Sequence, residues 1–126
     1  MDTPRILAIS DVRMTAPPAA REGIRDFYVT FVGLEPLDGQ EAPALVFLGR
    51  PRTGPRLIVS ITDEHCEPLP RRQLLVQVAN LAESAEDLLE RAVPFAWSRG
   101  WTSFDRRLAL QDPAGNWVEL VAYHPF

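Results

Sequence analysis

Two pairs of oppositely charged residues have the spacing to do chemistry on stretches that resemble β-strands. Asp11 and Arg13 are two residues apart, and side chains two apart on a strand point to the same face. Glu119 and Arg107 each have the parity opposite to the leucines of their own stretch. Such a glutamate can act as a general base at a carbon next to a carbonyl, while an arginine holds a substrate carboxylate or stabilises an enolate. Alternatively, Arg13 and Arg107 neutralise the two carboxylates and the four residues merely line a binding cup.

Other reactive residues fit catalysis less well. His65 and Cys66 are adjacent, and adjacent side chains rarely point together, which disfavours a Cys-His nucleophile pair. His124 has the parity opposite to Glu119, at the end of the chain. The sequence contains no lysine, which excludes Schiff-base chemistry.

Three tryptophans, Trp97, Trp101 and Trp117, lie in the last third of the chain. Trp101 is placed between Gly100 and Thr102, which favours a position at a pocket rim where the indole stacks on a flat ligand. The alternative is that the tryptophans pack in the core and at a dimer contact.

Length and composition predict one soluble domain spanning residues 1–126. Hydrophobic residues make up 46% and charged residues 24%, which are ordinary values for a globular protein. We find no apolar run of about 20 residues and no leader peptide, and the lone Cys66 cannot form an intrachain disulfide, so we expect a cytoplasmic protein. The net charge of -4 argues against nucleic acid as a partner.

The apolar patterns repeat one order of elements in the two halves of the chain. In the first half we expect a strand over residues 5–16, a helix from Ala20 to Gly33, and strands at 44–48 and 56–62. In the second half we expect a helix after Asn80, which has capping-box spacing to Glu83. Strands are expected on either side of it, at 73–79, 95–97, 106–111 and 117–123. The order βαβββ therefore occurs twice, in half-modules at about 5–62 and 72–123.

Three motifs carry a resemblance to a known family. The stretch Asp112-Pro113-Ala114-Gly115-Asn116-Trp117-Val118-Glu119-Leu120 is similar to the DPxGNxxEL ending of the vicinal oxygen chelate superfamily, which comprises glyoxalases, bleomycin resistance proteins and extradiol dioxygenases. Arg25-Asp26-Phe27-Tyr28 with Val32-Gly33-Leu34 resembles its first helix and turn, and Val78-Ala79-Asn80-Leu81 the entry to its second helix. The resemblance implies an α+β fold in which two βαβββ modules form a curled mixed sheet with a concave cavity and helices on the outer face.

The resemblance also implies a set of site residues. The positions that often ligate a divalent metal in the family correspond here to Asp11, Ser60, Gln73 and Glu119, so both family histidines are missing. Aspartate, glutamine and glutamate offer only oxygen donors, which suit Mg²⁺, Mn²⁺ or Ca²⁺ rather than Zn²⁺. We therefore expect no cofactor, or a weakly bound divalent cation, at Asp11, Gln73 and Glu119. The candidate catalytic residue is Glu119, and the candidate ligand-binding residues are Arg13, Ser60, Gln77, Trp101, Arg107 and Trp117.

Two functions follow from the resemblance. One is an enzyme, lyase, isomerase or dioxygenase-like, that acts on a small oxygenated organic molecule in the cup of the sheet. The other is a metal-free binding or sequestration module of the bleomycin-resistance type. The partners expected are a small-molecule ligand and a second copy of the chain, with Trp97 or Phe126 at the dimer contact. Strand parity predicts that Asp11, Gln73 and Glu119 converge on one cavity, and that Val12, Leu74 and Leu120 lie under helices.

Overall fold

The first module contains one helical segment and a four-stranded sheet. In the computed structural model, which describes residues 4–37, 44–64, 73–99 and 106–122, the helical segment runs from Pro18 to Val32. It begins as a 3-10 turn (Pro18–Ala20), continues as α1 (Arg21–Arg25) and ends as a π-helix (Asp26–Val32). The strands are β2 (Val12–Ala16), β3 (Glu35–Pro36), β4 (Ala44–Leu48) and β5 (Arg56–Ile61).

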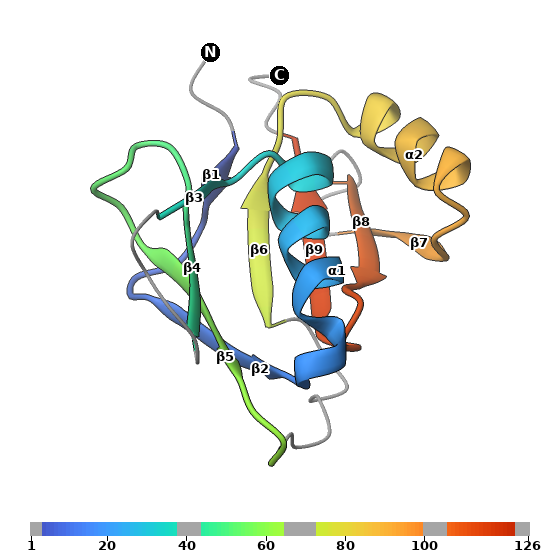
Figure 1. The fold of residues 1–126 in the computed structure, drawn as a ribbon. Coiled ribbons are helices and arrows are strands. Elements are labelled where there is room, and N and C mark those ends of the chain that lie inside the picture. Colours follow the sequence, from blue (N-terminus) through green and yellow to red (C-terminus); the bar gives the residue numbers. More distant parts are fainter. Residues whose placement is uncertain (1–3, 38–43, 65–72, 100–105, 123–126) are drawn as a thin grey trace.

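The second module repeats this arrangement. It consists of β6 (Leu74–Gln77), α2 (Leu81–Glu90), β7 (Phe95–Arg99), β8 (Arg106–Gln111) and β9 (Trp117–Val121). The strand order is β6-β9-β8-β7 in this module and β2-β5-β4-β3 in the first module. In each module the first strand pairs parallel with the last one, as β2·β5 and β6·β9. The predicted α+β class with two βαβββ modules is confirmed (Figure 1).

The strand predicted over residues 5–16 is divided between the two sheets. Its first part, β1 (Arg5–Ile6), pairs antiparallel with β6, and its second part, β2, pairs with β5. Residues 7–11 between these two parts are in no strand, so the prediction of one unbroken strand was wrong. We call residues 7–11, which connect the two sheets, the crossing segment. The curled sheet is therefore formed in two parts, five-stranded and four-stranded.

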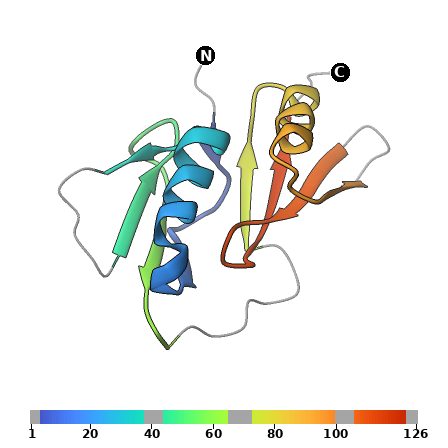
Figure 2. The same cartoon turned by 45° about the vertical axis from the view of Figure 1, so that its right-hand side comes forward.

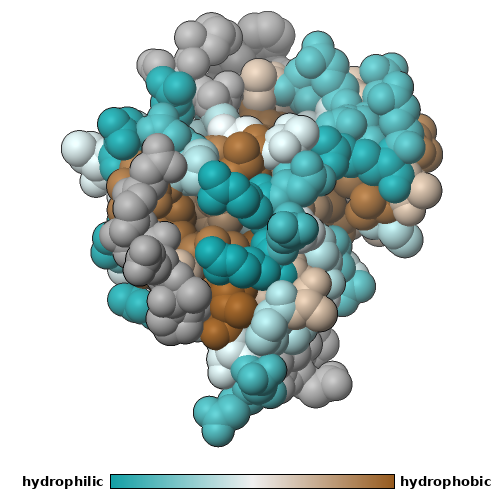
Figure 3. All heavy atoms as spheres, in the orientation of Figure 1, coloured by the Kyte–Doolittle hydropathy of each residue, from teal (hydrophilic) through white to brown (hydrophobic). Residues whose placement is uncertain are grey.

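The hydrophobic core lies between the sheets and the helices. Alternation along β6 and β9 buries Leu74 and Leu120 as predicted, each 1% exposed, while Val12 is half-buried against the core. The helical segment lies between the two sheets and α2 beside the five-stranded sheet (Figure 2). Polar side chains gather over the outer surface of both helices (Figure 3), which matches the predicted arrangement of helices on the outer face. No helix among the described residues is long and apolar enough to cross a membrane.

Local sequence explains both helix ends. Gly33 follows the π-helix with φ of 93°, a left-handed conformation that glycine adopts without steric cost, and its N–H donates to the Tyr28 carbonyl at 3.1 Å. At the start of α2 the Glu83 N–H donates to the Asn80 side chain at 3.2 Å, and the Asn80 amide approaches the Glu83 carboxylate at 3.4 Å. The predicted cap by Asn80 is therefore confirmed, but the Glu83 carboxylate contacts the Asn80 side chain rather than the Asn80 backbone N–H that completes a capping box.

A buried polar cluster after β8 joins the two modules. Asp112, 4% exposed, accepts hydrogen bonds from the Tyr28 hydroxyl at 2.7 Å and from the backbone N–H groups of Ala114 and Asn116 at 2.8 and 3.0 Å. The Asn116 side-chain amide donates to Asp112 as well as to the Thr15 carbonyl, both at 3.1 Å. Four donors thus compensate one buried carboxylate. The motif predicted as a tight turn also ties β2 and the first helix to the second module.

The Tyr28 hydroxyl gives this cluster a measurable pH dependence. Burial, followed by the neighbouring Asp112 carboxylate, raises the pKa of Tyr28 well above its usual value. The folded chain therefore keeps a proton that the unfolded chain loses at roughly pH 10, so the free energy of unfolding should fall as pH rises above roughly 10. Tyr28→Phe should abolish this slope and lower the free energy of unfolding at neutral pH by about 1–3 kcal/mol.

Urea denaturation at a series of alkaline pH values measures both effects. The absence of lysine leaves few other groups that titrate there. Tyr123→Phe, which changes the only other tyrosine, serves as the control and should keep the slope. Equal slopes in the unmodified chain and in Tyr28→Phe would show that Tyr28 is not the group responsible.

Candidate functional site

The crossing segment and the start of β6 enclose a hollow of about 400 Å³. We call it the cup hollow; its lining residues are Leu7, Ala8, Ile9, Ser10, Asp11, Val12, Gln73 and Leu75. Two of the three residues predicted to converge, Asp11 and Gln73, therefore face the same space, although they are 62 positions apart in the chain. The polar side chains stand against a wall formed largely by aliphatic ones, a combination that suits a small organic ligand.

Asp11 is held by an arginine that the sequence analysis did not single out. Its carboxylate accepts from the Arg56 backbone N–H at 2.9 Å and from the Arg56 guanidinium at 3.2 and 2.8 Å. The parallel pairing of β2 with β5 places Val12 opposite Leu57, which brings Asp11, the residue before β2, beside Arg56, the first residue of β5. The expectation that Arg13 is the partner was therefore wrong. Hydrogen bonds from Arg56 lower the pKa of Asp11, and Arg13 adds only a weaker effect of its charge.

Gln73 lines the cup hollow and carries a buried acceptor. Its backbone N–H donates to the Trp117 carbonyl at 2.9 Å, which extends the β6·β9 ladder by one residue and fixes the position of Gln73. Its side-chain oxygen Oε1 is buried and has no hydrogen-bond partner in the part of the chain that the structure describes. A buried carbonyl oxygen without a partner costs free energy, and a donor on a bound molecule would recover it.

Glu119 shares the sheet face of Gln73 but is already engaged. It stands opposite Leu75 in the β6·β9 ladder, and its Oε1 lies 3.2 Å from the guanidinium of Arg107. The side chains of this pair are 22% and 17% exposed, so Glu119 does not face bulk solvent. Glu119 is not among the residues that line the cup hollow. The predicted pairing of Glu119 with Arg107 is thus observed, and it leaves the carboxylate less suited to take a proton from a substrate.

The other candidate residues are dispersed. Gln77 stands opposite Arg5 at the far end of β6, and Trp117 opposite Gln111 on β9. Ser60 lies on β5 four residues beyond Arg56, which is level with Asp11, and thus about 13 Å along the strand from it. Arg13 is exposed on β2. The predictions that concern Trp101, Phe126, the pair His65 and Cys66, and His124 lie outside the described residues.

The residues at the family's metal positions do not fit a metal ion. Both oxygens of Asp11 accept from Arg56, and the Glu119 carboxylate lies against Arg107, so each acid already has a cation beside it. Gln73 contributes a neutral oxygen only. Among the residues that the structure describes, no group of three or more His, Cys, Asp or Glu is placed to hold a metal. A cation would have to displace two guanidinium groups to gain two carboxylates, which is unfavourable for oxygen-only ligands.

Comparisons with known proteins find solved structures that share the fold of this chain. No family model matches the sequence, and no curated protein matches it. Among solved structures, the chain is similar to TnmS3, an antibiotic binding protein from Streptomyces sp. CB03234, with 25% identity, 94% of this chain and 99% of that chain covered, and a TM-score of 0.67. It is also similar to a member of the glyoxalase/bleomycin resistance protein/dioxygenase superfamily from Sphaerobacter thermophilus DSM 20745, with 20% identity, coverage of 94% and 98%, and a TM-score of 0.67.

A third solved structure bears the name of an enzyme. Lactoylglutathione lyase from Agrobacterium tumefaciens has 20% identity to this chain, covers 91% of it over 92% of its own length, and gives a TM-score of 0.65. The resemblance drawn from the sequence motifs is confirmed by these structures: the chain has the fold of the glyoxalase/bleomycin resistance protein/dioxygenase superfamily. Because one fold supports many activities, the fold does not decide the function.

The Asp11–Arg56 contact can be tested by carboxyl titration. We expect NMR titration over the acidic range to give Asp11 a pKa below its ordinary value, because Arg56 stabilises the charged form. The stability that this pair contributes is present above the ordinary pKa of aspartate and is lost as pH falls through the lowered value. Arg56→Gln should raise the pKa of Asp11, whereas Arg13→Gln should shift it less. A larger shift in Arg13→Gln would contradict the pairing.

Proposed function

We propose that the chain binds a small oxygenated organic molecule in the cup hollow, without a metal ion. The observation that carries this proposal is the buried Oε1 of Gln73, an acceptor with no partner among the described residues, at a hollow of about 400 Å³. A ligand hydroxyl or N–H would donate to Gln73, and Leu7, Ile9 and Leu75 would cover its apolar part. The likeness to a protein described as antibiotic binding supports this class of function.

Catalysis remains the alternative proposal. The residue for it is Glu119, a carboxylate on the same face of the sheet as Gln73, and the chemistry would be proton abstraction next to a carbonyl, as in a lyase or isomerase. A dioxygenase-like reaction is the other form of this alternative, and the engaged acids give no metal site for it. The base would first have to leave Arg107. We therefore favour binding over catalysis.

We further propose a cytoplasmic homodimer. β7 is an edge strand of the five-stranded sheet, and its Trp97 is 44% exposed with the Arg106 guanidinium 4.2 Å from the ring centroid. An exposed tryptophan on an open sheet edge supports a contact with a second copy of the chain. Cys66 is the single cysteine, so the chain cannot form an intrachain disulfide, which supports the proposal of a reducing compartment.

Replacing Gln73 separates stability from binding. Gln73→Leu removes a buried acceptor that has no partner, so we expect the free energy of unfolding to stay constant or to rise by up to about 1–3 kcal/mol. The same change should weaken binding of ligands found by a thermal-shift screen of hydroxylated and carbonyl compounds about tenfold, because one hydrogen bond is lost. Isothermal titration calorimetry measures the affinities.

Gln77→Leu is the matched control for this experiment. Gln77 lies on the same face of β6 but is not among the residues that line the cup hollow. We expect this variant to keep the affinity of the unmodified chain. If Gln73→Leu binds the screened compounds as tightly as Gln77→Leu does, the proposed site is wrong.

Elemental analysis tests the proposed absence of a metal. Protein purified without a histidine tag should contain no stoichiometric transition metal, because the acids are paired with arginines and no imidazole is present among Asp11, Gln73 and Glu119. Changing Asp11 and Gln73 together to His should create affinity for Zn²⁺ or Ni²⁺. About one bound transition metal per unmodified chain, lost in Glu119→Ala, would contradict the proposal and favour the enzyme.

A further inference from the structure

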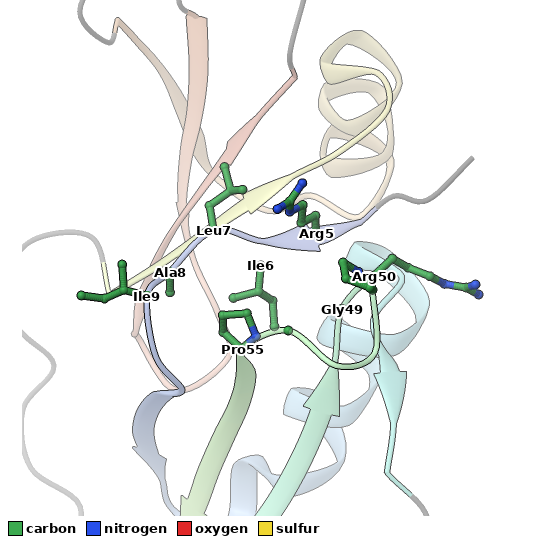
Figure 4. A pocket seen from close by; sticks show the side chains of 10 residues that line it. Arg5, Ile6, Leu7, Ala8, Ile9, Gly49, Arg50 and Pro55 are labelled. Atoms are coloured by element: carbon green, nitrogen blue, oxygen red, sulfur yellow. The ribbon is translucent and has the colours of Figure 1, made fainter.

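A second hollow, of about 420 Å³, lies against the crossing segment, and we call it the seam hollow. It is lined by residues 5–9 and by residues 49–51, 54 and 55 of the loop between β4 and β5. Figure 4 shows that its charged side chains, Arg5 and Arg50, both point away from Ile6 and Pro55. Among the described residues, the seam hollow therefore presents an apolar wall without a charged side chain that could orient a ligand.

A third hollow, of about 320 Å³, lies at the start of α2, and we call it the helix hollow. Residues 79–82, which lead into α2 and begin its first turn, line one side of it. The other side is formed by Trp97 on β7, by Arg106 on β8 and by Ala122 directly after β9. The helix lies over the part of the five-stranded sheet that carries β7 and β8 (Figure 1).

Strand register shows that Trp97 and Arg106 face α2. Trp97 stands opposite Leu108 in the β7·β8 ladder, and Arg106 precedes Leu108 by two residues on β8. Residues that stand opposite each other or are two apart share one face of a sheet, and Leu108 is buried in the core cluster that includes Leu81 of α2. The guanidinium of Arg106 accordingly lies over the Trp97 ring, 4.2 Å from its centroid. Both side chains thus meet at the helix hollow.

Arg106 is held beside the hollow but keeps its hydrogen-bond donors. Stacking on an indole orders the guanidinium plane, whereas the N–H groups lie around the edge of that plane and stay available. No ion pair of Arg106 occurs within residues 4–37, 44–64, 73–99 and 106–122, and no acid is among the described residues that line the hollow. A stacked, uncompensated guanidinium suits a carboxylate, because little further side-chain entropy is lost when two parallel N–H groups bind it.

The remaining lining suits an apolar body. Trp97 is 44% exposed, so much of a large ring still faces water. Leu81 and Ala122 are buried and contribute aliphatic surface, and the small side chains of Ala79 and Ala82 lie beside them. Covering apolar surface of this kind is favourable. One hollow thus combines a planar cation with an aromatic and aliphatic wall.

We propose that the helix hollow binds a small carboxylic acid, with its carboxylate on Arg106 and its flat apolar body against Trp97 and Leu81. Gln73 of the cup hollow points to the other face of this sheet, because it precedes the buried Leu74 by one residue. The helix hollow is therefore a second site that goes beyond the proposed function. Its lining comes from one chain, so it does not depend on the proposed homodimer.

The anion 2-naphthoate and its uncharged amide, 2-naphthamide, serve as probes, and NMR titration of the full chain measures their affinities. We expect Arg106→Gln to weaken naphthoate binding about tenfold, because a charge-assisted contact is lost, and to leave naphthamide binding unchanged. Arg106 is exposed, so this change should leave the fold intact. Arg25→Gln is the matched control: Arg25 is exposed on α1 and does not line the hollow, and its replacement removes the same charge.

Chemical shifts of the unmodified chain locate the probe independently of any variant. Naphthoate should shift the indole N–H signal of Trp97 and the amide signals of Leu81 and Ala82. These shifts should exceed those of the amides of Gln73 in the cup hollow and Gly49 in the seam hollow.

The two proposed sites can fail separately. Gln73→Leu, which tests the cup hollow, should bind naphthoate as the unmodified chain does. The helix site is overturned if naphthoate does not bind, if Arg25→Gln weakens its binding as much as Arg106→Gln does, or if the largest shifts occur at the cup hollow or the seam hollow.

Discussion

The carboxylate of Asp112 is the interaction on which the relative position of the two modules depends. It accepts four hydrogen bonds, and the donors come from the first helix as well as from its own turn. Among the described residues, the only ladder that joins the N-terminal part of the chain to the second module is that of β1 with β6, which is two residues long. Such a short ladder fixes an angle poorly. A buried carboxylate restricts the geometry more strongly, because losing any one of its donors leaves part of a desolvated negative charge without a hydrogen bond. The free-energy cost of that loss favours one arrangement of the two modules.

That arrangement determines where ligands can enter. The N-terminal stretch pairs first with β6, through β1, and then with β5 of the other sheet, through β2. The crossing segment between β1 and β2 therefore pairs with neither sheet along most of its length, and each of the two hollows lies against this segment. The same backbone therefore forms a wall of both spaces, whereas the opposite walls differ in charge. Gln73, directly before β6, lies on the opposite wall of one hollow, and the loop after β4 forms the opposite wall of the other. Two hollows of similar volume thus differ in the chemistry of their linings.

Features that depend on neighbours in the sequence were predictable, and those that depend on strand register were not. Residues 44–48 and 106–111 form the strands expected from their apolar pattern, and Asn80 caps α2 as its spacing to Glu83 predicts. The partner of Asp11 could not be chosen from the sequence, because Arg56 reaches it only through the pairing of β2 with β5. The division of the first strand was missed for the same reason: alternation shows which face is buried but not which strand lies alongside.

The pairing of Asp11 with Arg56 also bears on which ligands the proposed site in the cup hollow would select. A neutral ligand does not break a charged contact such as that in which two guanidinium N–H groups of Arg56 donate to one carboxylate oxygen of Asp11, since it offers no compensating charge. Asp11 therefore contributes a fixed, neutralised group to the lining of the cup hollow, and the lining acceptor without a partner among the described residues is the Oε1 of Gln73. A site with one buried acceptor that lacks a partner favours molecules with a donor over molecules of the same shape without one, because only the former supply the missing hydrogen bond. Selectivity in this cup can thus arise from an uncharged amide, at a position where the family often uses a metal ligand.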